Sequence, residues 1–222
     1  MSAIREYARA LLRESRVAVL ARRGLFFFVL PLMAAVAVAV LFPCDVEIAD
    51  WISRDGKGFL GFVARRYTHY ADFRLTLELF LAFWLVGMWK RREDWKRLGL
   101  AILLSAAIAG ALDTSIRALT GRPRPSAHLP DRFTGPQLRD HRLQSFPSGH
   151  SATAMATAGV VAVALPEVGI PFFLFSLGVP WGRFYQHEHY ASDVIVGSLI
   201  GLWFGLALGW GWRRTTPTTS SL

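Results

Sequence analysis

The chain has 222 residues, 53% of which are hydrophobic, and a formal net charge of +9. Its single cysteine, Cys44, excludes an intramolecular disulfide and a cysteine-rich zinc site. A positive charge of this size would suit a nucleic-acid partner, but the basic residues lie at the ends of hydrophobic runs, where they can meet anionic lipid headgroups. We therefore expect a membrane protein with no nucleic-acid partner.

Residues 1–24 form a basic leader. Its arginines recur about every four residues, so they share one face of a helix, and leucine and valine residues occupy the rest. The arginines with this spacing are Arg5, Arg9 and Arg13, and Arg16 follows them. This pattern predicts an amphipathic helix that lies at the membrane interface and anchors the first span, with partner binding as the alternative. We expect no cleaved signal peptide, because the hydrophobic run that follows is longer than a typical signal sequence.

Six hydrophobic runs nearly free of charge follow the leader, at 25–42, 75–89, 98–112, 151–165, 168–181 and 194–212. Only the first and the last reach the roughly 18 residues that by themselves indicate a membrane span. The others reach that length if their polar flanks continue the helix. The runs predict an all-α fold: a six-transmembrane-helix bundle that occupies residues 25–214 as one domain, followed by a short disordered tail at 215–222.

The distribution of basic residues sets the expected orientation. The leader places more positive charge before the first span than lies shortly after it, which favours cytoplasmic N- and C-termini in a bacterial-type inner membrane. In that topology the loops 113–150 and 182–193 meet at the outer, periplasmic face. Residues 44–74 balance acidic against basic residues and include several aromatic ones, so we expect them to form an interfacial cover over this face.

The first group of residues suited to chemistry follows the third run, where Arg117, Arg122 and Arg124 fall within eight residues. Arginine presents a planar fork that matches a pair of phosphate oxygens. Pro123 and Pro125 keep this segment out of a helix, so the forks are held in fixed directions. The alternative is that arginines at a helix end simply reach to the lipid headgroups.

The second group, Phe146-Pro-Ser-Gly-His150, directly precedes the fourth run. The start of a helix offers unpaired backbone N–H groups and the positive end of a dipole, which favour an anion. Ser148 can donate its hydroxyl, and Gly149 allows the backbone to approach an oxyanion closely. His150 then lies in the first turn, where it can transfer a proton. A purely structural histidine is the alternative.

The third group is the stretch 183–193, where one arginine, two histidines, a glutamate and an aspartate lie between two hydrophobic runs. Arg183 supplies another fork. His189 and Asp193 are four residues apart, so they share a face if the last helix begins near His189. An aspartate that accepts from one imidazole nitrogen fixes the tautomer and leaves the other nitrogen free to attack. A metal site at 187–189 is the alternative, but adjacent residues do not converge easily on one ion, so we expect no metal and no cofactor.

These three groups resemble the signature of the type 2 phosphatidic acid phosphatase superfamily, which also includes vanadium haloperoxidases. The family pattern is Lys-x6-Arg-Pro, then Pro-Ser-Gly-His, then Ser-Arg-x5-His-x3-Asp. Its positions are matched here by Arg117, Arg124, Pro125, Pro147, Ser148, Gly149, His150, Arg183, His189 and Asp193. The chain departs from the pattern twice, because Arg117 stands in place of lysine and Gly182 in place of serine. The first change keeps the cation, and the second removes a hydroxyl.

The resemblance implies a metal-independent phosphatase. In such an enzyme, His189 is the nucleophile that forms a phosphohistidine, and Asp193 orients it. His150 protonates the leaving oxygen and later activates water. The residues that hold the phosphoryl oxygens are Arg117, Arg124, Ser148, Gly149 and Arg183. Fixed arginines and a helix N-terminus suit phosphoryl transfer, because that reaction depends mainly on positioning and on neutralising negative charge.

We therefore expect a lipid phosphatase that acts on a phosphomonoester or pyrophosphate of a membrane lipid. Candidate substrates are undecaprenyl pyrophosphate, phosphatidylglycerophosphate, phosphatidic acid and the phosphate of lipid A. The alternatives are a lipid-to-lipid phosphotransferase that uses the same phosphohistidine and a non-catalytic lipid-phosphate binding or transport protein. The pair of histidines argues against the last, because binding alone would need only the arginines. The sequence leaves open the headgroup, the acyl chain and the oligomeric state.

Overall fold

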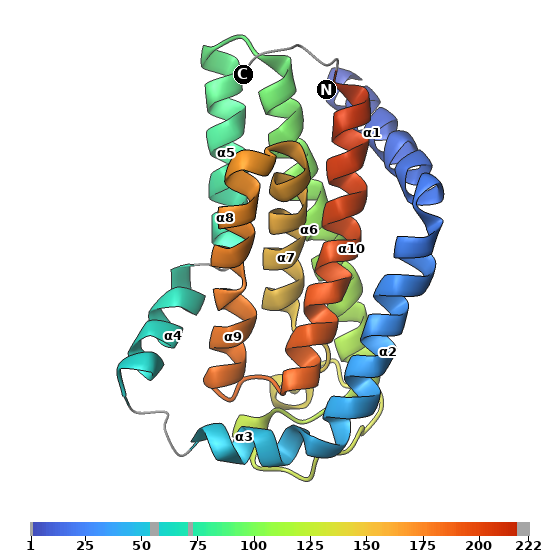
Figure 1. Cartoon of the computed structure of the whole chain (residues 1–222). Helices are drawn as coiled ribbons and strands as arrows, with labels where there is room; N and C mark the ends of the chain where they lie inside the picture. The colour runs from blue at the N-terminus through green and yellow to red at the C-terminus, as the bar shows by residue number, and fades with distance from the viewer. Residues whose placement is uncertain (1, 54–57, 71–72, 217–222) are drawn as a thin grey trace.

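The structure is a computed structural model that describes residues 2–53, 58–70 and 73–216, and all regular secondary structure within these ranges is helical. The predicted all-α fold is therefore confirmed. The hydrophobic runs all lie in helices, which form an elongated bundle (Figure 1). The α-helices are α1 (Ser2–Ala21), α2 (Leu30–Leu41), α3 (Asp45–Ser53), α4 (Phe59–Tyr70), α5 (Phe73–Trp89), α6 (Glu93–Thr120), α7 (Gly149–Ala164), α8 (Pro166–Ser176), α9 (Gly178–Tyr185) and α10 (Ala191–Thr215).

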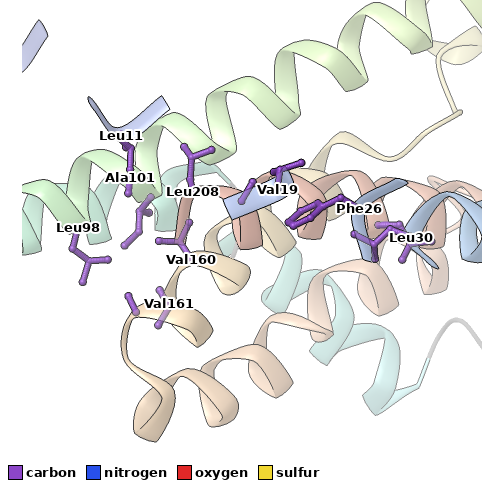
Figure 2. Close-up of a cluster of buried hydrophobic side chains, with 13 residues drawn as sticks. Leu11, Val19, Phe26, Leu30, Leu98, Ala101, Val160, Val161 and Leu208 are labelled. Carbon is purple, nitrogen blue, oxygen red and sulfur yellow. The ribbon is translucent and has the colours of Figure 1, made fainter. Parts of the chain in front are cut away.

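The leader forms α1, which continues through a π-helical segment (Leu25–Val29) into α2 and packs along α10 (Figure 1). Leu11 and Val19 of α1 are buried in the main hydrophobic core, together with residues of α6, α7 and α10 (Figure 2). Phe26 contacts Trp203 of α10 edge-on, with ring centroids 5.1 Å apart. One face of the leader thus belongs to the bundle, while its place at a membrane interface stays a prediction.

Helices α7 and α10 approach closely at the centre of the bundle, because several glycines of α10 lie against the backbone of α7. A Cβ on Gly201 would come within 2.2 Å of the Ala152 carbonyl oxygen. Gly197 lies in the same way against Ser148, whose N–H donates to the Asp193 carbonyl at 3.0 Å. Glycines permit this backbone-to-backbone contact, which small residues typically provide in membrane helix pairs. The start of α7 is therefore held next to the start of α10.

Within the described residues, three helical stretches are long and apolar enough to cross a membrane, judged by length and composition: Leu25–Ile52, Glu93–Ala127 and Ala191–Thr215. The runs at 75–89 and 151–165 form the shorter helices α5 and α7. The predicted count of six transmembrane helices therefore stays a prediction, supported by the structure for three of the runs.

The run at 168–181 differs from expectation, because it is divided between α8 and α9 instead of forming one helix. At the junction, the Tyr67 hydroxyl of α4 donates to the Phe175 carbonyl. The Tyr67 ring lies where a side chain on Gly178 would be, with its nearest atom 2.4 Å from the position of such a Cβ. The interruption is thus occupied by a side chain from a distant part of the chain, which hydropathy alone does not show.

The start of α1 and the end of α10 lie at one end of the bundle (Figure 1). At the other end lie α3, the connection between α6 and α7, and the connection between α9 and α10. We call this second end the α3 end. The loops 113–150 and 182–193 therefore share one face, as the sequence predicted, and the membrane side to which this face belongs stays a prediction.

Candidate active site

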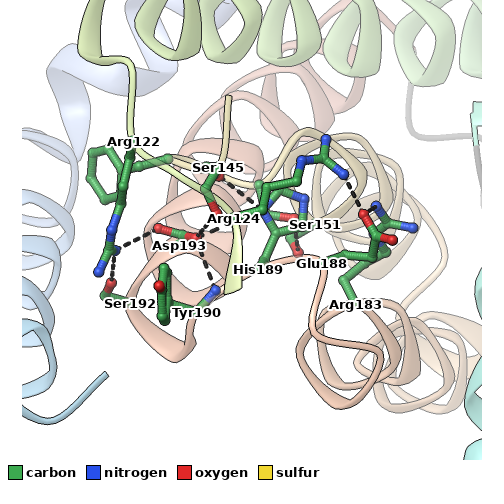
Figure 3. Close-up of polar contacts among 12 residues, drawn as sticks. Arg122, Arg124, Ser145, Ser151, Arg183, Glu188, His189, Tyr190, Ser192 and Asp193 are labelled. Atoms are coloured by element: carbon green, nitrogen blue, oxygen red, sulfur yellow. Dashed lines mark hydrogen bonds and ion pairs between the residues drawn. The ribbon is translucent and has the colours of Figure 1, made fainter. Parts of the chain in front are cut away.

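The residues predicted to carry chemistry meet at the α3 end of the bundle (Figure 3). Backbone hydrogen bonds join the segments that carry them. The Ser145 N–H donates to the Arg122 carbonyl at 2.9 Å, and the Ser126 N–H donates to the His187 carbonyl at 3.0 Å. Together with the contact between α7 and α10, these bonds bring the three groups of the sequence into one site.

His189 is the buried centre of this site, with 1% of its surface exposed. Its Nδ1 lies 2.8 Å from the carbonyl oxygen of Ser145. A carbonyl oxygen can only accept a hydrogen bond, so Nδ1 carries the proton and Nε2 is the unprotonated nitrogen. Nε2 is buried and has no hydrogen-bond partner among the described residues. The ring is therefore held in the tautomer that leaves Nε2 available for attack.

Asp193 lies beside His189 but does not hold the ring directly, because its Oδ2 is 3.8 Å from Nδ1. Oδ2 instead accepts from the Ser145 hydroxyl at 2.5 Å and from the Tyr190 N–H at 2.9 Å. Oδ1 accepts from Arg122 at 2.7 Å. The expected direct hydrogen bond between His189 and Asp193 is thus absent, since the Asp193 carboxylate caps the start of α10 and pairs with Arg122. Ser145 connects the two residues instead: its hydroxyl donates to Asp193 and its carbonyl accepts from His189.

The surroundings of His189 lower its pKa below the ordinary value of 6.5. Burial is the main cause, since it disfavours the charged imidazolium, and the positive charges of Arg183 and Arg124 act in the same direction. Asp193 opposes the shift in part. His189 is therefore neutral at neutral pH, which is the state that a nucleophile requires.

This pKa predicts the acidic limit of any reaction that starts at Nε2. As the pH falls through the pKa of His189, the ring gains a proton and loses its lone pair. We expect kcat/KM to fall as the pH is lowered. The part of this loss that is due to the enzyme should have its midpoint below pH 6.5. The measurement is kcat/KM for phosphate release across the acidic range, corrected for the separately titrated substrate phosphate. A corrected midpoint above pH 6.5 would contradict the assigned state of the ring.

Arg117, which replaces the lysine of the family pattern, forms an ion pair with a buried carboxylate that fixes the direction of its side chain. Its Nε lies 2.9 Å from Oδ2 of Asp113, which is one turn earlier in α6 and fully buried. Its Nη2 donates to the Thr114 hydroxyl at 3.0 Å. A Cβ on Gly149 would lie 3.2 Å from the same Nη2, so the guanidinium packs directly against the start of α7. Asp113 was not predicted from the sequence, although an aspartate four residues before an arginine in a helix indicates a possible ion pair.

Glu188 joins the two other arginines of the site. Its Oε2 contacts Arg124 Nη1 and lies 3.3 Å from Arg183 Nη2 (Figure 3). From the sequence, Glu188 was considered only as a ligand of the alternative metal site at 187–189, and no motif assigns it another role. The structure shows that one carboxylate occupies the same two guanidinium groups that the sequence assigns to the phosphate.

We expect Glu188→Gln to bind phosphate-like anions more tightly. The glutamine has no charge, so vanadate no longer competes with a carboxylate for Arg124 and Arg183. The gain should be about 10-fold, the scale of one charge-assisted hydrogen bond. The measurement is the Ki of vanadate, with Glu167→Gln at the start of α8 as the matched control. Weaker vanadate binding in Glu188→Gln would mean that the carboxylate chiefly positions the arginines.

Arg122, which the sequence groups with the arginines suited to phosphate, instead pairs with carboxylates in the structure. It is completely buried. Its Nη1 contacts Asp193 at 2.7 Å, and its Nη2 contacts Asp45 at 3.0 Å and Asp131 at 2.6 Å. The guanidinium carbon lies between two aromatic rings, 4.2 Å from the ring centroid of Tyr190, which precedes α10, and 4.2 Å from that of Phe42, which follows α2. Through Asp45, the start of the predicted cover at 44–74 is tied to the site itself.

The start of α7 contributes the remaining predicted residues. Ser148 is fully buried at the N-cap position, where its hydroxyl accepts from the Ser151 hydroxyl at 2.9 Å. His150 follows in the first turn and is half-buried. It lines a cavity of about 630 Å³ together with Arg183. The histidine and the arginine predicted at separate positions of the chain therefore border one accessible space, and Ser148 lies buried beside it at the start of α7.

Gly182, the second departure from the family pattern, has a structural explanation. A Cβ at this position would lie 2.6 Å from Cγ2 of Thr68 in α4. Gln186, one turn later, donates to the Thr68 hydroxyl at 2.6 Å and to the Ala64 carbonyl at 3.1 Å. The glycine leaves room for α4 to pack against α9, so the missing serine is replaced by contact with another helix.

Metal ligands are not assembled among the described residues, where no group of three histidine, cysteine, aspartate or glutamate side chains could hold an ion. The site that the structure does assemble consists of arginine forks, buried carboxylates that pair with them, and two histidines. Such a site can bind a phosphoryl group through charge and hydrogen bonds supplied by the protein.

Comparison with known proteins assigns the chain to a family. The model of the PAP2 superfamily matches residues 98–216. The lipid A 1-phosphatases of Rhizobium johnstonii and Rhizobium etli are each 31% identical to the chain over 112 residues, which is 49% of this chain. The aligned region covers 46% and 48% of those two proteins, so the chain spans about half the length of the curated relatives it matches.

Two solved structures have a similar fold. The first is a transmembrane PAP2 type phosphatidylglycerolphosphate phosphatase from Bacillus subtilis, with a TM-score of 0.65 and 23% identity over 88% of this chain and 97% of that chain. The second is LpxE from Aquifex aeolicus, with a TM-score of 0.54 and 25% identity over 74% of this chain and 93% of that chain. The family match covers more than half of the chain and includes all three groups of site residues. With its membrane-length helices, the chain is an integral membrane protein that belongs to the PAP2 superfamily.

Proposed function

We propose that this chain is a membrane lipid phosphatase that uses His189 as its nucleophile and requires no metal. The observation that carries the proposal is the buried Nε2 of His189, in a tautomer fixed by the Ser145 carbonyl and close to Arg124 and Arg183 (Figure 3). What supports this role for His189 is that its unprotonated nitrogen has no hydrogen-bond partner among the described residues and lies beside two arginines that can bind phosphate.

The reaction has two steps. In the first, the Nε2 lone pair of His189 attacks phosphorus, and the bond from phosphorus to the lipid oxygen breaks while His150 gives that oxygen a proton. In the second, His150 takes a proton from water, the water oxygen attacks phosphorus, and the phosphorus–nitrogen bond breaks. Inorganic phosphate then leaves, and both histidines return to their starting states.

The arginines stabilise the charge of the phosphoryl group in both steps. Arg117, Arg124 and Arg183 neutralise its equatorial oxygens, and the Gly149 N–H and Ser148 hydroxyl at the start of α7 add hydrogen bonds. Arg117 and the start of α7 are held in place before the substrate binds, by Asp113 and by the packing of α7, and the substrate displaces Glu188 from Arg124 and Arg183 as it binds. Little reorganisation is therefore needed in the transition state.

The proposed substrate is a phosphate on a lipid headgroup. The site lies at one end of helices that are long enough to cross a membrane, which is the depth of a headgroup. The relatives named as lipid A 1-phosphatases favour lipid A first, and the structurally similar phosphatidylglycerolphosphate phosphatase favours a phospholipid next. We place the site at the outer face of a bacterial inner membrane, with both termini in the cytoplasm.

The test uses the full chain purified in detergent with a chelator present. Phosphate release is measured from lipid A, phosphatidylglycerophosphate, phosphatidic acid and undecaprenyl pyrophosphate. We expect release from at least one of them, and inactivity on all four would reject the proposal. With radiolabelled donor lipid, label that moves to a second lipid instead of to inorganic phosphate would identify a phosphotransferase.

A further inference from the structure

The cavity beside His150 and Arg183 extends beyond the residues needed for one phosphate. Its other lining residues are Phe62, Arg65, Arg66, Thr68, Arg74 and Gln186, all but one of which come from α4 and α5. Its volume is about 630 Å³, which is more than one phosphoryl group needs. A phosphoryl group at His150 and Arg183 would contact only one side of it, which we call the catalytic side. The site therefore has a second, arginine-lined side that the proposed reaction does not use.

Specific contacts fix this second side in place. The hydrogen bonds from Gln186 to Thr68 and Ala64 hold α4 against α9, and Gly182 leaves the space for that contact. Arg183 is the residue that follows Gly182. The helix that carries Arg65 and Arg66 is therefore docked next to a phosphate-binding arginine, at a point where the chain departs from the family pattern.

The two sides of the cavity differ in how their charge is balanced. On the catalytic side, Arg124 and Arg183 contact Glu188. On the other side, Arg65 and Arg74 are exposed and make no ion pair with any described residue. No carboxylate is among the residues that line the cavity within the described part of the chain. A concave surface that carries charge of one sign concentrates ions of the opposite sign.

We propose that Arg65, Arg66 and Arg74 form a second anion subsite, which binds a second phosphate group of the lipid whose first phosphate lies at His189. The guanidinium of Arg66 lies over the ring of Phe62, 5.4 Å from its centroid, which favours a defined direction for its fork. The subsite gives the enzyme a preference for lipids with two phosphates over lipids with one. This inference rests on the proposed function, since it assumes that the first phosphate is the one removed.

A second phosphate can sit next to the first, as in a pyrophosphate, or elsewhere on the headgroup, and the experiment distinguishes the two. One pair of substrates is an isoprenyl pyrophosphate and the isoprenyl monophosphate of the same chain length. The other pair is lipid A with both phosphates and lipid A with only the 1-phosphate. The assays use neutral detergent micelles, so that anionic bilayer lipids contribute nothing.

The variant is Arg65→Ala combined with Arg74→Ala, and the control is Arg139→Ala, an exposed arginine in the connection between α6 and α7 that does not line the cavity. We expect wild type and control to favour the diphosphorylated member of one pair by about 10-fold in kcat/KM. The double variant should lose this preference and keep kcat/KM for the monophosphorylated member within about two-fold, since these exposed arginines do not contact the first phosphate. The pair that shows the effect locates the second phosphate.

Two results would overturn the subsite: no preference in the wild type for either pair, or an equal loss on both members of a pair in the double variant. Each leaves the proposed function intact, because phosphate is still released. If the wild type releases no phosphate from any lipid, the proposed function fails instead. The subsite is then decided by calorimetric binding of inorganic pyrophosphate, which the double variant should bind about 10-fold more weakly than the control. Equal binding by both would overturn it.

Discussion

His189→Ala is expected to lower kcat for lipid phosphate hydrolysis by about 10⁴-fold or more, the scale seen when an enzyme loses its nucleophile. The substitution removes Nε2, the buried nitrogen without a partner among the described residues. The measurement is phosphate release at saturating substrate, combined with quenching of the enzyme on radiolabelled substrate in alkaline detergent. Wild type should trap label on the protein as an acid-labile, alkali-stable phosphohistidine, and the variant should trap none.

The matched control for this prediction is His187→Ala, two residues away on the same connection between α9 and α10. His187 contributes its backbone carbonyl to Ser126, and that bond survives the substitution. We expect this control to keep most of its activity and to trap label normally. A comparable loss in both variants would instead favour a site that uses both histidines together, such as a shared metal.

Arg122→Met is expected to cause the largest loss of stability, about 3–5 kcal/mol, because it leaves buried carboxylates without their cation. Asp45 and Asp193 are both fully buried and both contact the Arg122 guanidinium. The measurement is the unfolding midpoint in detergent. The effect should reach activity as well, since Asp193 acts on His189 through Ser145. Arg122→Lys should recover only part of the stability, because one ammonium cannot replace a fork that contacts three carboxylates.

Arg142→Met is the control for the stability of Arg122→Met. Arg142 also pairs with an aspartate, Asp140, at 2.9 Å, but its side chain is 74% exposed. Exposed pairs of this kind contribute little, so the unfolding midpoint should barely change. The Arg122 network would lose its assigned role if both variants unfolded at the wild-type temperature. A second check is Arg122→Met combined with Asp45→Asn, which should be less destabilised than Arg122→Met alone.

The residues that could be predicted from the sequence are those whose chemistry follows from spacing. His189, His150 and the arginines predicted to bind phosphate stand at fixed positions in ordered motifs, and the structure brings them together. The all-helical fold followed from long hydrophobic runs in the same way. Both predictions depend on patterns along the chain, which the sequence displays directly.

The partners of these residues could not be predicted, because they come from distant segments. Asp45 reaches Arg122 across 77 positions of the chain, and no periodicity marks it. The Ser145 carbonyl takes the ring proton of His189 because of how the connection between α6 and α7 folds, and backbone atoms carry no sequence signal. Glu188 was visible, but its role depends on two arginines from different segments that meet at its side chain. Tyr67, which lies against Gly178 at the break between α8 and α9, likewise comes from a distant helix, α4.

The glycines of α10 also determine which helix beside the site can move when a bulky lipid binds. Gly201 and Gly197 place the backbones of α7 and α10 in direct contact. His150 lies in the first turn of α7 and His189 lies two residues before α10, so this contact limits how far the segments that carry the two histidines can move relative to each other. Helix α4, in contrast, stands at the edge of the bundle and packs mainly on α9 (Figure 1). We therefore expect a headgroup that needs more space to displace α4, while the contact between α7 and α10 stays unchanged.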